Sequence, residues 1–149
     1  MPFQDVLRKY RTESYSEREK GARFEELIAR YLMTDPAYSV QLEWVRTWND
    51  FFGREDMGGQ DTGIDLVART KAGEYWAVQC KCYAEGHRVT KADMDTFMSA
   101  SGRTFDDEGE RRGFSRRLVV ATTDDWTDNA LESAVGQTIP VSIITLGLL

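Results

Sequence analysis

The chain has 149 residues, of which 41% are hydrophobic and 30% are charged, which is ordinary for a globular domain with a proper core. No run of residues approaches the length of a membrane span, and residues 1–5 lack the basic and apolar regions of a secretion signal, so we expect one cytoplasmic domain without a membrane partner. The net charge of −6 argues against a large, unspecialised DNA-binding surface, and the single histidine, His87, leaves little material for a histidine triad or a multi-histidine zinc site.

Two helices are expected at the start of the chain. Residues 3–12 carry apolar side chains at helical spacing, and a Ser-x-x-Glu capping box at Ser16 predicts a longer helix that runs to about Met33. The apolar arc of this helix includes Phe24, and Glu25 falls at the edge of the arc, about 100° further round the axis. A helix packed through this arc would hold the Glu25 carboxylate at the rim of a sheet, whereas a solvated helix face is the bland alternative.

The next segment is expected to hold the first strand and a loop. Asp35-Pro36 should end the helix, because the residue before a proline is pushed out of helical geometry. Alternating apolar residues then predict a strand at 38–45. The polar, glycine-bearing stretch 49–63, which contains Asp56 and Asp61, is typical of an active-site loop whose backbone approaches a ligand closely.

Two runs rich in β-branched and aromatic residues follow, at 64–68 and 75–83, and predict a hairpin. Their link, Lys71-Ala72-Gly73, suits a three-residue loop with glycine in the left-handed conformation. Asp65 and Gln79 lie equally far from Ala72, so this loop places them opposite one another, with Lys81 on the same face as Gln79 and diagonal to Asp65. A slip of one residue would move Asp65 to the other face.

One carboxylate, one amide and one ammonium therefore converge on one patch of the predicted sheet. An Asp–Lys ion pair on a solvated face is one interpretation. The other is a cation site, because oxygen atoms of Asp65, Gln79 and the Cys80 backbone carbonyl suit Mg²⁺, with Lys81 beside bound water and a substrate phosphate. Cys80 and Cys82 should point to the opposite face and serve as small packing residues.

The second half of the chain is expected to alternate helices and strands. A helix opens at Thr90-Lys91-Ala92-Asp93 and runs to about Ser101, and an exposed loop follows at 106–117. A buried strand at 118–122, a helix at 126–137 and a final strand at 141–146 complete the chain. This order predicts an α/β fold in which a mixed central sheet, including the antiparallel hairpin, is flanked by helices.

The arrangement Asp65…Gln79-x-Lys81, within the strings GIDLVA and QCK, resembles the PD-(D/E)-x-K nuclease motif in the variant where glutamine replaces the second acid. The wider pattern resembles Mrr-like restriction endonuclease domains, such as those at the amino terminus of type ISP restriction enzymes and in helicase-linked restriction proteins. The resemblance covers nearly the whole chain. It implies a restriction-endonuclease-like core and Mg²⁺-dependent hydrolysis of DNA, with Mn²⁺ able to substitute.

The resemblance also implies roles for individual residues. Asp65, Gln79 and the Cys80 carbonyl would hold the cation, and Lys81 would orient or deprotonate the attacking water. Glu25 matches the acid of the family's G-x-x-F-E string and would serve as a carboxylate of the metal site, in its outer shell.

The helix that follows the catalytic strand lies near DNA in the family, so Lys91 is a candidate phosphate contact, with a solvated lysine as the alternative. The resemblance further implies that residues 1–149 are a single nuclease domain excised from a larger protein with helicase or translocase and methyltransferase domains. Two other functions stay open: a non-catalytic DNA-docking or protein-interaction module of a restriction complex or helicase, and a Holliday-junction resolvase, for which a long basic surface would be expected.

Overall fold

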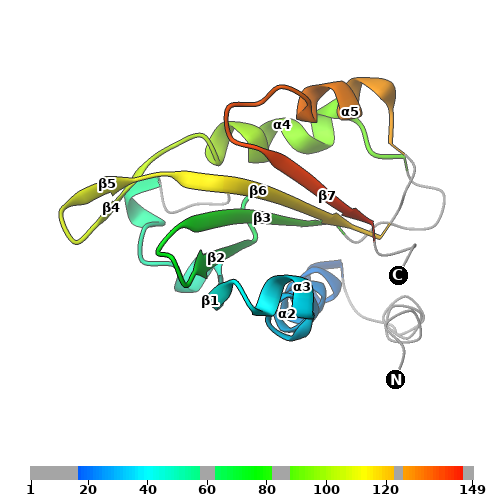
Figure 1. Ribbon diagram of the computed structural model, residues 1–149. Helices are drawn as coiled ribbons and strands as arrows, with labels where there is room; N and C mark the ends of the chain where they lie inside the picture. Colours follow the sequence, from blue (N-terminus) through cyan, green and yellow to red (C-terminus); the bar gives the residue numbers. More distant parts are fainter. Residues whose placement is uncertain (1–16, 58–62, 82–87, 123–125, 146–149) are drawn as a thin grey trace.

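A five-stranded mixed sheet forms the centre of the computed structural model, which describes residues 17–57, 63–81, 88–122 and 126–145 (Figure 1). The strand order is β1-β2-β3-β6-β7, in which β1, β2 and β3 run antiparallel while β3, β6 and β7 run parallel. The strands are β1 (Leu42–Thr47), β2 (Leu66–Thr70), β3 (Tyr75–Lys81), β6 (Phe114–Ala121) and β7 (Val141–Thr145).

Helices cover both faces of this sheet, as the sequence predicts. On one face lie α2 (Glu17–Thr34) and the short α3 (Pro36–Ser39), and on the other lie α4 (Lys91–Ala100) and α5 (Asp128–Ala134) (Figure 1). The described helices include none that is long and apolar enough to cross a membrane. The predicted helix at 3–12 and the Ser16 cap lie outside the described residues.

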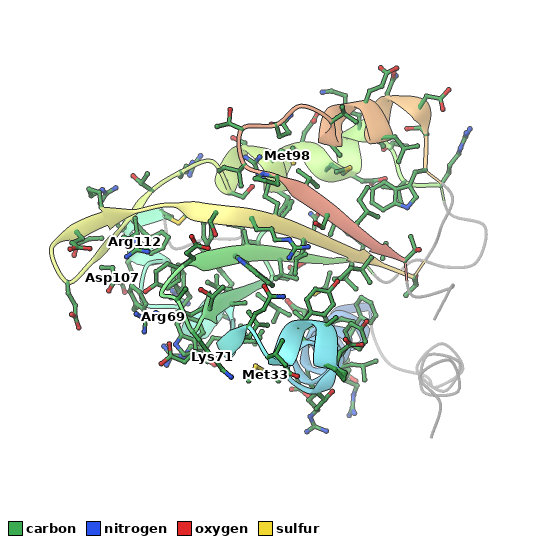
Figure 2. All side chains as sticks on the ribbon, viewed as in Figure 1. Met33, Arg69, Lys71, Met98, Asp107 and Arg112 are labelled. Atoms are coloured by element: carbon green, nitrogen blue, oxygen red, sulfur yellow. The ribbon has the colours of Figure 1, made fainter. Side chains whose placement is uncertain are left out.

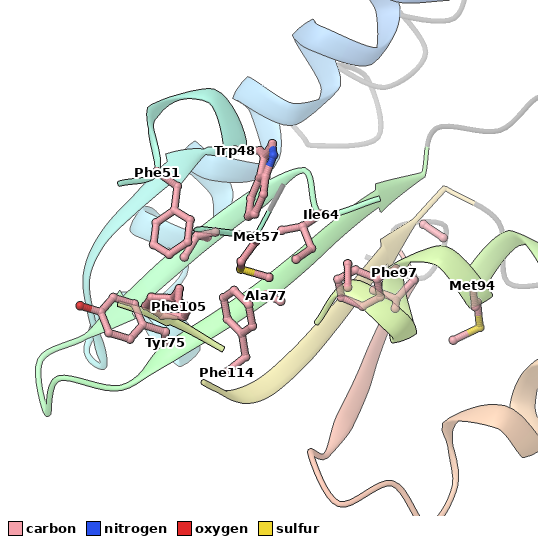
Figure 3. Close-up of a cluster of buried hydrophobic side chains, with 14 of the residues drawn as sticks. Trp48, Phe51, Met57, Ile64, Tyr75, Ala77, Met94, Phe97, Phe105 and Phe114 are labelled. Carbon is pink, nitrogen blue, oxygen red and sulfur yellow. The ribbon is translucent and has the colours of Figure 1, made fainter. Parts of the chain in front are cut away.

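Two hydrophobic cores result, one on each side of the sheet. Phe24, Ile28 and Leu32 recur at intervals of four residues on α2, so they form one buried stripe against the sheet. The opposite core is larger and rich in aromatic rings, and it joins the sheet to α4 and to two 3₁₀ turns, η1 (Trp48–Asp50) and η2 (Glu55–Met57) (Figure 3). The hairpin strands β2 and β3 contribute side chains to both cores.

The β2–β3 hairpin has the predicted loop and register. Gly73 has a φ of +88°, and its N–H donates to the Thr70 carbonyl at 2.9 Å. The paired residues run from Arg69 with Tyr75 to Leu66 with Val78, all equally spaced about Ala72. The register prediction is therefore confirmed over the length of the ladder.

Three predicted elements are wrong in their extent. Strand β1 begins at Leu42 and not at residue 38, because the Asp35 side chain caps a new helical turn that has Pro36 in its first position. The segment 106–117 is not a loop: β4 (Phe105–Asp107) and β5 (Glu110–Arg112) form a hairpin, and β6 has already started at Phe114. Helix α5 starts only at Asp128, where the Thr127 hydroxyl accepts a hydrogen bond from the Ala130 N–H.

Candidate active site

The predicted site residues gather where β2 and β3 separate. The hairpin ladder ends at Leu66 and Val78, so Asp65 and Gln79 do not form the expected ladder pair. The Asp65 N–H instead donates to the Val78 carbonyl at 2.9 Å, which makes the strand irregular at this point. The Asp65 carboxylate turns towards β3, where its Oδ2 accepts a hydrogen bond from the Cys80 N–H at 2.8 Å. A backbone donor therefore fixes the orientation of the carboxylate.

The direction of the β3 backbone brings a second oxygen to this place. Val78 directs its carbonyl towards the β2 side, and residues two apart on a strand direct their N–H and C=O groups to the same side. Cys80, two residues on, therefore directs both its N–H and its carbonyl towards Asp65, and the N–H is the donor to the carboxylate. The carbonyl that the sequence nominates as a cation ligand thus lies on the correct side of β3.

Gln79 carries the clearest anomaly of the site. The residue is only 2% exposed, and its Oε1 is buried without a hydrogen-bond partner among the described residues. A buried amide oxygen that lacks a donor destabilises the fold by about 1–3 kcal/mol. Gln79 shares the face of β3 with the half-buried Lys81, two residues further on.

Cys80 lies on the α2 side of the sheet, on the face opposite to Gln79 and Lys81 as predicted, and nearby charges shift the pKa of its thiol. The pKa of its thiol is raised well above the usual value, first by burial and then by the negative charges of Asp65 and Glu25, while the positive charge of Lys81 lowers it. The two carboxylates and the ammonium therefore all act on one point of β3. Glu25 is half-buried on α2 next to the fully buried Phe24, and its charge acts on the Cys80 thiol near the end of β3.

The donor set fits a hard cation that takes oxygen ligands. Within the described ranges, no three His, Cys, Asp or Glu side chains gather closely enough to hold a metal ion. A cation here would therefore depend on an amide and a backbone oxygen as well as on carboxylates. The unmet Oε1 of Gln79, the oriented carboxylate of Asp65 and the Cys80 carbonyl are such oxygens, and Mg²⁺ binds oxygen ligands of this kind.

Helix α4 supports the segment that leads to Asp65. Gly63 has a φ of +81°, and a Cβ on it would lie 3.1 Å from the backbone nitrogen of Phe97 and 3.3 Å from its Cα. The glycine-rich stretch was expected to approach a ligand, but this glycine approaches a helix. Because Gly63 lies two residues before Asp65, the packing against α4 fixes where the segment that carries Asp65 begins.

Asp56, another residue of the predicted active-site loop, contacts the β4–β5 hairpin. Asp56 accepts a hydrogen bond from the Asp106 N–H at 2.8 Å and pairs with Arg111, so it anchors the β4–β5 hairpin and takes no part in the site. Asp61 and Cys82 lie outside the described residues.

Lys91 lies on the surface of α4. Lys91, the candidate phosphate contact, has a 58% exposed side chain and pairs with Asp95 one turn along α4, at 3.1 Å. Thr122, a buried threonine directly after β6, was not predicted to belong to the site. Its N–H donates to the Lys81 carbonyl at 3.1 Å and so holds the backbone of that lysine. A polar residue that ends a continuous apolar strand was the available signal.

Comparison with known proteins gives a consistent result. A family model described as restriction endonuclease, of the Mrr catalytic type, matches residues 33–149. The structure is similar to that of the ATP-dependent type ISP restriction-modification enzyme LlaBIII bound to DNA, with a TM-score of 0.70 and 25% identity, over 98% of this chain and 8% of that one. It is also similar to the MspJI restriction endonuclease in complex with a 27-mer oligonucleotide, with a TM-score of 0.53 and 20% identity, over 97% of this chain and 28% of that one.

None of the curated proteins matches the sequence. The matched family region includes Asp65, Gln79 and Lys81 but begins after Glu25. Because the family model covers most of the chain, and because the mixed sheet is that of its structural neighbours, the chain belongs to the Mrr-like restriction endonuclease family of PD-(D/E)-x-K nucleases.

Proposed function

We propose that this domain is a Mg²⁺-dependent endonuclease that hydrolyses phosphodiester bonds of DNA in a restriction system. The observation that carries the proposal is the buried Oε1 of Gln79, to which no described residue donates, at the position where the family motif has a metal ligand. Gln79 directly precedes Cys80, and the Cys80 N–H donates the hydrogen bond that orients the Asp65 carboxylate. A cation that binds both oxygens would remove the cost of the unmet amide oxygen and neutralise the carboxylate.

Each residue of the site then has a distinct role. Asp65, Gln79 and the Cys80 carbonyl would hold Mg²⁺, with Mn²⁺ as a substitute. When bound, the ion would lower the pKa of its water and neutralise charge on the scissile phosphate. Lys81 orients or deprotonates the attacking water and donates hydrogen bonds to the phosphate oxygens as negative charge develops. Glu25, from α2, adds a carboxylate that orients water at the edge of the site.

The neighbours support DNA as the substrate and larger proteins as the context. LlaBIII is an ATP-dependent restriction-modification enzyme, and this chain spans 8% of its length. We therefore propose that a helicase or translocase domain and a methyltransferase domain accompany this domain in its parent protein. The net charge of −6 fits that arrangement, because a domain that is delivered to DNA by a motor needs little affinity of its own.

The proposal is tested by nicking of supercoiled plasmid with Mg²⁺ or Mn²⁺, for the wild type and for the Asp65→Ala and Lys81→Ala variants. We expect the wild type to nick, both variants to lose activity by at least about 100-fold, and EDTA to abolish the reaction. Glu25→Ala and Glu26→Ala form a matched pair, since Glu26 is an exposed neighbour on the same helix. Only the Glu25 variant should lose activity.

Binding of Mn²⁺, followed by electron paramagnetic resonance, gives a readout that does not depend on turnover. The wild type should bind Mn²⁺ and Asp65→Asn should bind it at least about tenfold more weakly. A wild-type domain that neither binds Mn²⁺ nor nicks would contradict the metal nuclease. Nicking that survives in the folded Asp65→Ala variant would show that the chemistry lies elsewhere.

A further inference from the structure

A pocket of about 760 Å³ lies at the end of the hairpin opposite to the candidate active site. We call it the hairpin-end pocket; three aromatic residues, three arginines and acids of the β4–β5 hairpin line it. Figure 2 shows Arg69, Asp107 and Arg112 together at this end of the molecule. The aromatic residues and arginines are Trp44, Phe52, Tyr75, Arg46, Arg69 and Arg112.

The pocket and the catalytic lysine share one face of the sheet. Trp44 pairs with Arg69, and Arg69 pairs with Tyr75, so these three side chains lie on the same face. Every second residue of β3 lies on that face, so Tyr75, Gln79 and Lys81 share it. Lys81 lies six positions after Tyr75 on β3, which corresponds to roughly 20 Å, or about six nucleotides of one strand of duplex DNA.

The aromatic residues form a continuous wall. The ring centroids of Trp44 and Tyr75 are 6.2 Å apart, and those of Phe52 and Tyr75 are 6.0 Å apart. Phe52 is 47% exposed although it is a large apolar residue. A planar ligand could therefore reach a ring surface without any rearrangement of the fold.

The arginines leave donors unused beside this wall. The Arg46 guanidinium lies 4.1 Å from the centroid of the Trp44 ring, and no residue in the described ranges forms an ion pair with it. Arg69 pairs with Glu43 at 3.1 Å through Nη1, but its Nε is buried and has no hydrogen-bond partner in the part of the chain that the structure describes. Arg112 donates to the Gly73 carbonyl at 2.6 Å. Two of the three arginines thus have donors that protein groups do not satisfy.

The acids of the pocket are paired to different extents, and Glu108, in the turn of the β4–β5 hairpin, is exposed. The Tyr75 hydroxyl donates to Asp107 at 2.6 Å, and Glu110 points outward with a 77% exposed side chain, 3.9 Å from Arg112. Within the described ranges, Arg46 is the charged side chain of the pocket that lies against an aromatic ring and has no ion-pair partner. The complementary ligand carries a flat ring and an anionic group, and a nucleotide has both.

We propose that the hairpin-end pocket binds one nucleotide unit, with its base against the exposed ring of Phe52, beside Trp44, and its phosphate against Arg46. The volume suits a ligand of this size. The unit could belong to a DNA strand that also reaches the catalytic lysine, or it could be a free mononucleotide. The chemistry is the same for both, and they differ in how affinity depends on strand length.

The test is made in the Asp65→Ala background without divalent metal, so that it is independent of catalysis. Fluorescence anisotropy measures binding of a labelled thymidine 12-mer, and unlabelled thymidine monophosphate and a 12-mer compete. Phe52→Ala should weaken binding at least fivefold, because stacking of one base on an aromatic ring is strong enough for such an effect. Arg46→Gln should also weaken it at least fivefold, because it removes the charged donor to the phosphate. Arg30→Gln, an exposed arginine on α2, is the matched control and should stay within twofold.

The competition data separate the two sources. A 12-mer that competes at least tenfold better than the monophosphate identifies a strand, whereas equal competition per molecule identifies a free nucleotide. The proposal is overturned if neither ligand binds, or if Arg46→Gln and Phe52→Ala bind as the Arg30→Gln control does. It is also overturned if an acidic, aromatic peptide binds in an Arg46-dependent manner and the nucleotides do not. Circular dichroism confirms that each variant is folded.

Discussion

Replacement of Gly63 by alanine tests whether packing against α4 positions the segment that carries Asp65. A residue with a Cβ in the left-handed conformation costs about 1–2 kcal/mol relative to glycine. The new Cβ would also lie 3.1 Å and 3.3 Å from backbone atoms of Phe97, whose side chain is fully buried, so the helix has little freedom to move away. Such overpacking adds about 1–3 kcal/mol. We expect a total loss of about 2–5 kcal/mol in the free energy of unfolding.

Gly109→Ala is the matched control for this variant. Gly109 also has a positive φ, of +89°, but a Cβ on it would meet no atom within 4 Å. Urea unfolding should therefore show a loss of only about 1–2 kcal/mol for Gly109→Ala. In the nicking assay, Gly63→Ala should be impaired under conditions where it remains folded, because Asp65 follows two residues later, and Gly109→Ala should be fully active. Equal stability losses in the two variants would refute the role assigned to the α4 contact.

Three other predictions concern buried polar groups. Burial, and then the hydrogen bond to Asp107, raise the pKa of Tyr75 from 10.0 to about 12; the protonated hydroxyl is thus favoured in the fold, so the stability that it contributes is complete below pH 10 and is lost as the pH rises from 10 to 12. The free energy of unfolding, measured with urea between pH 9 and 12, should fall more steeply with pH for the wild type than for Tyr75→Phe. Parallel curves for the two proteins would contradict this. Arg117 is buried and donates to the Ser101 hydroxyl and to the carbonyls of Met98 and Ile139, so Arg117→Ala should lower the free energy of unfolding by about 2–4 kcal/mol in the same measurement, and a loss below about 1 kcal/mol would show that these bonds matter little. Gln79→Glu should destabilise the metal-free domain, because it buries a charge, and Mg²⁺ should restore the melting temperature; a variant whose melting temperature does not respond to Mg²⁺ would argue against the cation site.

The hairpin could be predicted from the sequence because its determinants are local. The three-residue loop with Gly73 in the left-handed conformation sets the register, and the alternation of side chains then places Gln79 and Lys81 on one face. The position of Glu25 was likewise accessible, because it follows from the spacing of the apolar stripe on one helix.

The remaining features depend on contacts between distant segments. The acidic and basic run at 106–117 has the composition of a loop, yet much of its backbone forms a hairpin. Asp56, which lies 50 residues before Asp106 in the sequence, anchors this hairpin. The turn of Asp65 towards Cys80 and the missing donor at Gln79 depend on how β2 leaves the ladder. Periodicity cannot show such an irregularity, because it affects a single residue at the end of a strand.

The position of β3 between the two cores has a consequence for how the domain should fail under stress. Glu25 is held by the layer of α2, whereas the start of the Asp65 strand is held by the layer of α4, through Gly63. Loosening of either layer would move one carboxylate relative to the other before the central sheet separates. The relative position of the Glu25 and Asp65 carboxylates is therefore kept only while both layers are intact. Heat inactivation should precede the loss of sheet structure, whichever helical layer unfolds first.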